Sequence, residues 1–493
     1  MKSTSKPHII FIMTDQQRGD TLGCTGNRII KTPHIDQLAK EGVVFKNAYT
    51  SAPSCTPARA GLLTGMKPWN HGMLGYGRVG ENYKYELPRM VRHAGYYTFG
   101  IGKMHWFPQK TTHGFHGTLV DESGRVESKE FVSDYHQWFQ KEAPGKDPNA
   151  TGIGWNENKH GQYVLDERLH PTSWTGDQAV KKIQKHDPSK PLFLKVSFAR
   201  PHSPYDAPKR FAEQYNWENM PDPVIGDWCD FQKEFRKQKN PYFGDFGMKT
   251  AKKARQYYYG NITFIDEQVG KIKDVLKEKG MYDNSFIFFT ADHGDMLGDH
   301  YHWRKTYAYE GSANIPMLMK WPRDLETYVE KGSEMKQVTE LRDILPTLLD
   351  ITGQKIPDEM DGDSLLKLIT EKNPKWREWV DLEHSTCYHK RNYWMALTDG
   401  KMKYIYFRST GNEQLFNLKK DPGEIHDLAD DPDYEEELEK WRSRMIDHLS
   451  ERGKGWVKDG KLQTSKKGML YGPNYPDYKE SFFQKILRKI RGY

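Results

Sequence analysis

The sequence predicts an α/β protein in which a mainly parallel sheet is flanked by helices and followed by a smaller C-terminal antiparallel sheet with one helix. Three observations predict this fold class. Short runs of β-branched and aromatic residues alternate with amphipathic helical patterns along most of the 493 residues. Four of these runs end directly at polar residues that can carry chemistry. After about residue 373, short strand patterns follow one another closely, with turns between them.

Four buried strands are predicted in the first part of the chain. They cover His8–Met13, Tyr96–Ile101, Leu192–Phe198 and Ser285–Thr290. Each is followed within a few residues by polar side chains. In the order of the strands, these are Asp15 and Gln16; Lys103 and His105; His202; and Asp292 and His293. Because ligands bind at the carboxyl ends of parallel strands, these side chains are expected to converge on one pocket.

Helical patterns lie between these strands, and a second group of elements follows them. The predicted helices are Ile35–Glu41, Pro88–Ala94 and Tyr258–Lys279. The C-terminal elements are strands at Trp379–Glu383, Tyr393–Leu397, Lys403–Phe407 and Glu413–Asn417 and a helix at Tyr434–Glu451. The predicted division is a large domain over 1–375, a smaller C-terminal subdomain over 376–455 and a basic tail over 456–493.

The net charge of the chain is carried by its C-terminal end. The sequence holds 74 Lys and Arg against 67 Asp and Glu, a formal charge of +7, and this whole surplus lies after residue 450. The rest is formally neutral, which argues against a nucleic-acid-binding protein. The tail resembles an amphipathic helix that packs on the protein or on a partner subunit, with contact to a membrane or a polyanion as the alternative. Its apolar residues are Phe482, Phe483, Ile486, Leu487 and Ile490.

The composition is that of a soluble globular protein. Hydrophobic residues make up 36% of the chain and charged residues 29%. The apolar run Ile9–Met13 is shorter than the roughly 7–15 residues of a signal-peptide core or the ~20 of a membrane helix. No membrane span is expected. The protein is expected to be cytoplasmic if the chain is complete, and periplasmic or secreted if a signal peptide was removed.

The four cysteines, at positions 24, 55, 229 and 387, are too few and too scattered for a disulfide framework, and they contain no Cys-x-x-Cys pair. Cys55 stands apart because of its surroundings. It lies in the segment Pro53-Ser-Cys55-Thr-Pro57-Ala-Arg59-Ala-Gly-Leu-Leu-Thr-Gly65.

This segment resembles the signature of the type I sulfatases of the alkaline-phosphatase superfamily, Cys or Ser-x-Pro-x-Arg followed by an apolar pair, Thr and Gly. A second family signature matches at Gly95-Tyr-Tyr-Thr98 and Ile101-Gly-Lys103-Met-His105. The resemblance extends from Pro7 to about Asp431, because residues 413–418 and 421–424 are similar to the family's closing segment. It implies an alkaline-phosphatase-like sheet, a sulfuric-ester hydrolase activity and a catalytic role for residues 1–375.

The resemblance implies that Cys55 is the precursor of the nucleophile. In the family, a maturation enzyme oxidises this cysteine to formylglycine, whose hydrated aldehyde carries two hydroxyl groups. One hydroxyl attacks sulfur and the alcohol leaves, which gives a covalent sulfate ester. Deprotonation of the second hydroxyl then expels sulfate and regenerates the aldehyde, a step that a serine could not perform.

The resemblance also implies roles for five further residues. Arg59 holds the formylglycine, Lys103 contacts the diol and the sulfate, and His105 takes the proton that starts sulfate expulsion. His202 and Lys305 bind the ester oxygen, and one of the two protonates the leaving group.

One divalent metal ion is expected beside Cys55. The resemblance places its other ligands on Asp15, Gln16, Asp292 and His293. Two carboxylates and an amide oxygen favour a hard cation, calcium first or magnesium, while the imidazole also tolerates manganese. Many relatives carry Asp at the position of Gln16 and Asn at that of His293, which leaves the identity of the metal open.

The expected substrate is a sulfated carbohydrate, with small aryl sulfates as a further class. The segments 111–163, 203–248 and 384–391 are candidates for shaping its pocket. Some aromatic and cationic residues suit a sulfated sugar, although ordinary packing explains them equally well: Trp106, His302, Trp303, Arg304, His384 and Arg391.

Two other functions stay open at this stage. A phosphonate or phosphate ester hydrolase of the same superfamily would use the same diol, metal and cations. A catalytically silent binding protein would keep the fold with Cys55 unmodified, but the intact set of catalytic candidates argues against it. A homo-oligomer is compatible with the sequence.

Overall fold

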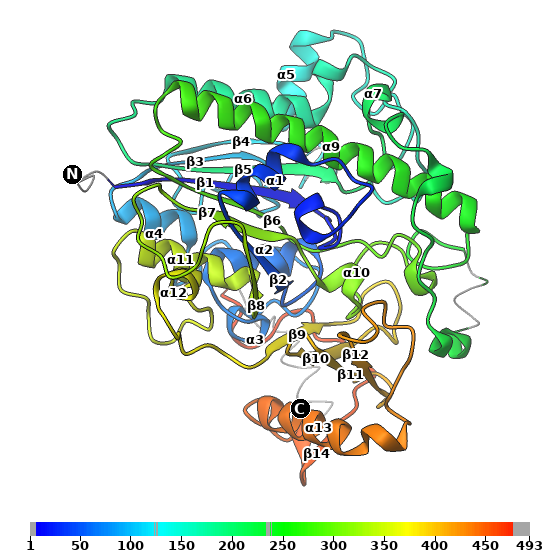
Figure 1. Ribbon diagram of the computed structural model, residues 1–493. Coiled ribbons are helices and arrows are strands. Elements are labelled where there is room, and N and C mark those ends of the chain that lie inside the picture. Colours follow the sequence, from blue (N-terminus) through cyan, green and yellow to red (C-terminus); the bar gives the residue numbers. More distant parts are fainter. Residues whose placement is uncertain (1–5, 123, 125–126, 233–236, 238, 477–493) are drawn as a thin grey trace.

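An eight-stranded sheet forms the centre of the part of the chain that the computed structural model describes, residues 6–122, 124, 127–232, 237 and 239–476 (Figure 1). Its strand order is β4-β3-β5-β1-β6-β7-β2-β8. The strands are β1 (His8–Asp15), β2 (Gly42–Tyr49), β3 (Tyr97–Gly102), β4 (Gly117–Val120), β5 (Leu192–Pro201), β6 (Ser285–Ala291), β7 (Met317–Lys320) and β8 (Ser333–Glu340).

The sheet is parallel except at β7. β1 pairs in parallel with β5 and β6, and β3 pairs in parallel with β5 and β4. β7 runs antiparallel to both β6 and β2, and β2 pairs in parallel with β8. The prediction of a mainly parallel sheet is confirmed, and the carboxyl ends of β1, β3, β5 and β6 lie at the same edge.

Helices cover both faces of this sheet, and this explains why the middle of β1, from Ile9 to Met13, is apolar without interruption. The side chains of Ile9, Phe11 and Met13 pack into one hydrophobic cluster, and those of Ile10 and Ile12 pack into another on the opposite face. The first cluster includes α2 (Cys55–Thr64), α4 (Leu87–His93), α11 (Ile344–Ile351) and α12 (Leu365–Thr370). The second includes α1 (Pro33–Lys40), α6 (Pro171–Lys185) and α9 (Met248–Glu278).

The predicted helices are present with shifted ends, and several further helices of the described chain were not predicted. α1 begins at Pro33, because proline fits the first turn of a helix, and α9 begins at Met248 rather than at Tyr258. α2 and α6 had no counterpart in the prediction. All ten residues of α2 are buried, so it shows no polar face and no helical period in its sequence.

A second sheet lies at the C-terminal end, in the order β12-β11-β10-β9. It is antiparallel throughout, as predicted. Its strands are β9 (Val380–His384), β10 (Trp394–Thr398), β11 (Met402–Tyr406) and β12 (Glu413–Asn417). One face packs on α13 (Glu435–Ser450) through Trp441 and Met445, and the other packs on the first domain around Tyr49 and Tyr309.

The boundaries at residues 375 and 455 stay predictions. A buried ion pair between Arg342 and Asp381, at 2.8 Å, crosses the first boundary. After α13 the chain forms β13 (Val457–Lys458) and β14 (Lys461–Leu462) and then returns to the first domain, where Leu470 O accepts a hydrogen bond from Leu74 N. The predicted tail helix over 481–493 lies outside the described residues. None of the described helices has the length and apolar surface needed to cross a membrane.

Candidate active site

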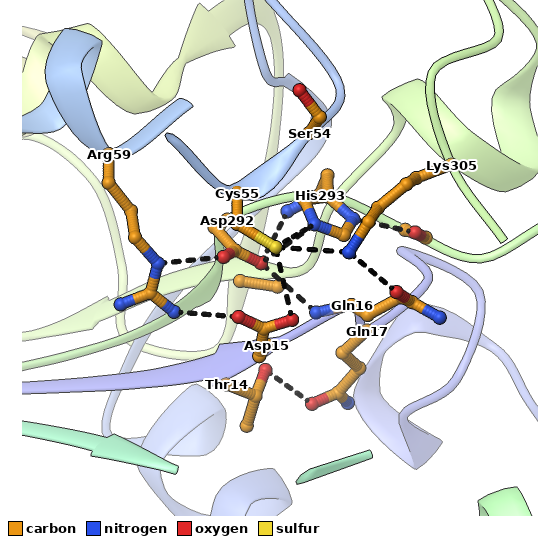
Figure 2. Close-up of polar contacts among 12 residues, drawn as sticks. Thr14, Asp15, Gln16, Gln17, Ser54, Cys55, Arg59, Asp292, His293 and Lys305 are labelled. Atoms are coloured by element: carbon orange, nitrogen blue, oxygen red, sulfur yellow. Dashed lines mark hydrogen bonds and ion pairs between the residues drawn. The ribbon is translucent and has the colours of Figure 1, made fainter. Parts of the chain in front are cut away.

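The side chains predicted at the strand ends meet at the carboxyl edge of the main sheet, and Figure 2 shows Asp15, Gln16, Asp292 and His293 among them. Asp15 ends β1, Lys103 follows β3, His202 follows β5 and Asp292 follows β6. Cys55 reaches the same place as the first residue of α2, after the loop that leaves β2. All five side chains are buried. The structure therefore brings together residues from five separate segments of the chain.

The Sγ atom of Cys55 lies among charged groups. Lys305 Nζ is 3.0 Å from Sγ, His293 Nε2 is 3.2 Å away and Asp15 Oδ1 is 3.6 Å away. Burial and the charge of Asp15 would raise the pKa of the thiol, but Lys103, Lys305 and His293 outweigh them and lower it. Residue 55 is present here as cysteine, so Sγ marks where the side-chain oxygens of an oxidised residue would lie.

Arg59 joins the two buried carboxylates of the cluster. It lies one turn after Cys55 on α2, and its Nε and Nη2 atoms are 2.9 Å from Asp292 Oδ2 and 3.0 Å from Asp15 Oδ2. Its Nη1 donates to the carbonyl oxygen of Lys103. Burial would lower the pKa of Arg59, but Asp292 and Asp15 raise it above its ordinary value. Arg59 therefore stays charged and holds both carboxylates in place.

Four buried side chains form a group that fits a metal ion. Ligand atoms of Asp15, Cys55, Asp292 and His293 all lie within 4.8 Å of one another. His293 Nδ1 donates to the carbonyl oxygen of Gly294 at 2.9 Å, which leaves Nε2 as the nitrogen that faces the group, 3.2 Å from Cys55 Sγ. Two carboxylates and an imidazole are a donor set for a divalent cation, and the residues present therefore fit the predicted metal.

Gln16, the remaining predicted ligand, borders this group. Its backbone N–H donates to Asp292 Oδ1 at 3.0 Å, and its Oε1 accepts a hydrogen bond from Lys305 Nζ at 3.0 Å. Its Nε2 donates to Asp295 Oδ2, which leaves Oε1 as the atom that faces the cluster. The φ of Gln16 is 66°, in the left-handed region that few residues with side chains adopt.

Two lysines supply positive charge around Cys55. Lys103 Nζ is 2.8 Å from Asp15 Oδ2, and Lys305 contacts the sulfur directly. Burial alone would lower the pKa of both lysines, but Asp15 and Cys55 raise it, so both remain ammonium groups. His202 behaves in the opposite way, because burial, Lys305 and Lys103 hold its pKa well below its ordinary value.

His105 lines a narrow cavity beside the cluster, of about 30 Å³. Tyr76, Lys103, Trp155 and His202 line the same cavity. The Trp155 ring centre is 5.3 Å from that of His202 and 5.4 Å from Lys103 Nζ, and the Tyr76 hydroxyl is 3.5 Å from His105 Nε2. An aromatic group therefore lies next to each of the proposed acid and base residues in this space.

Most of the residues considered for the substrate pocket take part in packing instead. Trp106 and Trp303 are buried in the two main hydrophobic clusters, and Arg304 is fully buried. His302 and Arg391 line a different cavity of about 610 Å³, between the first domain and the C-terminal sheet.

The C-terminal sheet supports the loop before Cys55 through His384, another of those residues. His384 Nδ1 donates to Ser385 O at 2.6 Å, so its Nε2 accepts the hydrogen of the Ser54 hydroxyl at 2.7 Å. Burial lowers the pKa of His384 to about 4, which keeps Nε2 unprotonated at neutral pH. Sequence reasoning missed this contact, because nothing local to Ser54 indicates a partner 330 positions away.

Replacing His384 by leucine should lower kcat about tenfold, because the Ser54 hydroxyl loses its acceptor and the start of α2 is released. Glutamine, whose amide oxygen can accept the same hydrogen bond, should retain most of the activity. Adding Ser54→Ala to His384→Leu should lower kcat little further, because both changes remove the same hydrogen bond. Comparing kcat of the two single variants with that of the double variant measures the coupling between the two residues. Fully additive losses would contradict it. His426 is exposed, so His426→Leu is the control, and its kcat should equal that of the wild type.

The fold and this site define a class of hydrolase. A buried nucleophile precursor at a helix N-terminus, a metal-ligand group and several cations at the carboxyl edge of a parallel sheet suit attack on an anionic ester of sulfur or phosphorus. A family model described as sulfatase matches residues 7–354, and one described as N-sulphoglucosamine sulphohydrolase, C-terminal, matches residues 298–451. The chain belongs to the sulfatase family, and the protein is an enzyme that hydrolyses sulfuric esters.

Similar proteins cover nearly the whole chain. An arylsulfatase of Clostridium perfringens (strain 13 / Type A) is 40% identical over 471 residues, 93% of this chain and 97% of that protein. The crystal structure of a phosphonate monoester hydrolase of Agrobacterium radiobacter has a TM-score of 0.76 at 23% identity and covers 91% of this chain and 96% of its own. A protein solved with its substrate D-glucosamine-2-N,6-O-disulfate has a TM-score of 0.72 at 19% identity, over 90% and 98% of the two chains. The predicted alkaline-phosphatase-like fold is confirmed.

Proposed function

We propose that this sulfatase removes sulfate from a sulfated carbohydrate, using formylglycine made from Cys55 by a maturation enzyme and one divalent metal ion. The observation that carries the proposal is the setting of Cys55, whose sulfur contacts Lys305 and His293 and lies beside Asp15. A cysteine buried for structural reasons behaves as a small apolar residue and packs among other apolar groups. Cys55 is instead surrounded by groups that activate a nucleophile.

Asp15, Asp292 and His293 would hold the metal, together with Gln16 Oε1 and the oxidised side chain of residue 55. Carboxylate and amide oxygens favour calcium, with magnesium and manganese as alternatives. When bound, the ion would supply positive charge to the attacking oxygen and to the sulfate oxygens.

The residues of the chain divide the remaining work. Arg59 fixes the two carboxylates from the side away from the sulfur, as its ion pairs at 2.9 Å and 3.0 Å indicate. Lys103 bridges Asp15 and residue 55, where it can bind the nucleophile and a sulfate oxygen. His105 lies two residues further along the same turn and accepts the proton when sulfate is released.

Departure of the alcohol requires a proton donor, and two residues are in place for it. Lys305 carries an ammonium group 3.0 Å from Cys55 Sγ. His202 faces the narrow cavity, and its Nδ1 donates to Ser203 O at 2.7 Å, so it can donate to the ester oxygen only after Nε2 has taken up a proton. We assign contact with the ester oxygen to both residues and protonation to one of them.

The proposed substrate class is supported by the groups around the cavity. The rings of Trp155 and Tyr76 can cover a sugar or an aryl ring, and Asn156 can bind hydroxyl groups. A structural neighbour binds a sulfated glucosamine, and the 40% identical relative is an arylsulfatase.

The experiment that tests this function compares sulfated monosaccharides of defined position, 4-nitrophenyl sulfate and a phosphonate ester as substrates of the formylglycine-bearing enzyme. We expect kcat/KM for at least one sulfated sugar to exceed that for the phosphonate by about 10³-fold or more, since a site built for one ester discriminates strongly. Faster cleavage of the phosphonate would favour a phosphonate hydrolase. If Cys55 stays unconverted when the protein is made with a maturation enzyme, and no ester is turned over, the silent binding protein is favoured.

A further inference from the structure

The turn after β3 carries two of the proposed catalytic residues in an uncommon backbone conformation. Lys103 and His105 lie in this turn, and His105 has a φ of 59°. The left-handed region is unfavourable for a residue with a side chain and persists where the surrounding structure holds it. The fold must therefore contain groups that keep His105 in place.

Glu122, two residues after the end of β4, makes such contacts. Its Oε1 atom accepts hydrogen bonds from the backbone N–H of Met104 at 2.8 Å and of His105 at 2.5 Å. β4 pairs in parallel with β3, with Val120 opposite Gly102, so the two segments leave the sheet side by side. Glu122 thus binds the turn at two successive residues.

The carboxyl group of Glu122 is buried beside the proposed catalytic residues. Glu122 is 2% exposed and lines the same narrow cavity as Lys103, His105 and His202. Burial raises its pKa to about 7, against the opposing effects of the His105 N–H, Lys103 and Arg59. A carboxyl group in such a place is costly to bury, and groups of this kind concentrate at functional sites.

We propose that Glu122 is a positioning residue of this enzyme, which holds the turn over 103–105 so that Lys103 and His105 keep the orientation that turnover requires. The inference rests on the roles proposed for these two residues. What matters in this role is the place of the acceptor oxygen. An uncharged acceptor at the same place should therefore serve nearly as well.

Two substitutions separate the position of the oxygen from its charge. Glu122→Gln keeps an acceptor at the same distance from the backbone and removes the charge, whereas Glu122→Asp keeps the charge and withdraws the oxygen by one methylene group. We expect kcat of Glu122→Gln to stay within about threefold of wild type and kcat of Glu122→Asp to fall about 10²-fold, because a misplacement of about 1 Å can cost this much. KM should change by less than about threefold in both, since neither variant removes a group proposed to bind the substrate.

Glu127→Ala is the matched control. The Glu127 carboxylate accepts a hydrogen bond from the N–H of Gln109 at 2.7 Å, a bond of the same kind in the neighbouring segment. This variant should keep kcat within about twofold of wild type. Melting temperature and the formylglycine content of each variant show whether folding and maturation are intact. The kcat of Glu122→Ala should fall as far as that of Glu122→Asp. If one of these two variants does not fold, the other is compared with Glu122→Gln in its place.

Equal losses in Glu122→Gln and Glu122→Asp would show that the charge is what matters and would overturn the proposal. Wild-type kcat in Glu122→Asp and Glu122→Ala would overturn it as well. Failure of the proposed function looks different. In that case the mature wild-type enzyme would release no sulfate from sulfated sugars, or Lys103→Ala and His105→Ala would keep full activity, whatever the Glu122 variants do.

Discussion

Cys55→Ala should abolish turnover, and Cys55→Ser should do so as well although serine retains a hydroxyl group. Alanine has no nucleophile, and serine can attack sulfur once but lacks the second hydroxyl group that would release sulfate. We expect kcat to fall by at least about 10⁴-fold in both variants, in line with losses of nucleophiles in other enzymes that use covalent catalysis. The serine variant should retain one sulfate group, visible as a gain of about 80 Da in its intact mass.

Peptide mass and kcat together check this expectation. In protein made with a maturation enzyme, the peptide that contains residue 55 should be about 18 Da lighter than its thiol form, because the thiol has become an aldehyde. kcat should rise in proportion to the converted fraction. Cys24, which lies in the short helical turn Gly23–Thr25 outside the cluster, provides the control in Cys24→Ala. Full turnover by unconverted wild-type protein would contradict the mechanism.

Lys305→Ala should cause the second largest loss, and the loss should depend on the leaving group. If Lys305 protonates the departing alcohol, kcat should fall about 10³-fold on a sugar sulfate but only about tenfold on 4-nitrophenyl sulfate, whose leaving group departs without a proton. The part common to both esters reflects the lost contacts of Nζ with Cys55 Sγ and Gln16 Oε1, both at 3.0 Å.

His202→Ala, measured on the same two esters, is the comparison that identifies the proton donor. The residue whose replacement shows the strong dependence on the leaving group donates the proton. Equal losses on both esters in Lys305→Ala would exclude Lys305 as the donor and leave it an electrostatic role. Lys46, which is partly exposed and pairs with Glu334, is a suitable control, since Lys46→Ala should change neither rate.

The distribution of charge explains why single cations are expected to matter so much. The +7 of the chain lies entirely after residue 450, so the part that carries the site is formally neutral. Attraction for an anionic ester therefore depends on Arg59, Lys103, Lys305 and the metal. These side chains are buried, and charges act more strongly there than at the surface.

Much of the catalytic centre was predictable from local sequence patterns. The runs of β1 and β6 are almost entirely apolar because both faces of the sheet are covered, and those of β3 and β5 are rich in aromatic and branched residues, so all four can be found without a structure. Their parallel arrangement then implies that Asp15, Lys103, His202 and Asp292 meet at one edge. The motif around Cys55 depends on residue types at fixed short spacing.

Other features left no local signal. α2 is buried on all sides and has no amphipathic period, and β7 is too short and too apolar to reveal that it runs against its neighbours. Glu122 supports the site through two hydrogen bonds, from the N–H groups of Met104 and His105, and His384 supports it through one hydrogen bond to Ser54. Neither residue belongs to a motif at fixed spacing, so only the packing of the elements identifies them.

The sequence by itself determined the fold class, the sulfatase family and the residue types that do the chemistry, because each of these follows from apolar periodicity or from a short motif. Only the tertiary structure decided how these residues are held. Arg59 clamps Asp15 and Asp292, Glu122 holds the turn of Lys103 and His105, and His384 reaches Ser54 from the second sheet. The physical reason is that hydrogen bonds and ion pairs form between whichever groups the packed core brings within about 3 Å, and that juxtaposition is a property of the whole chain.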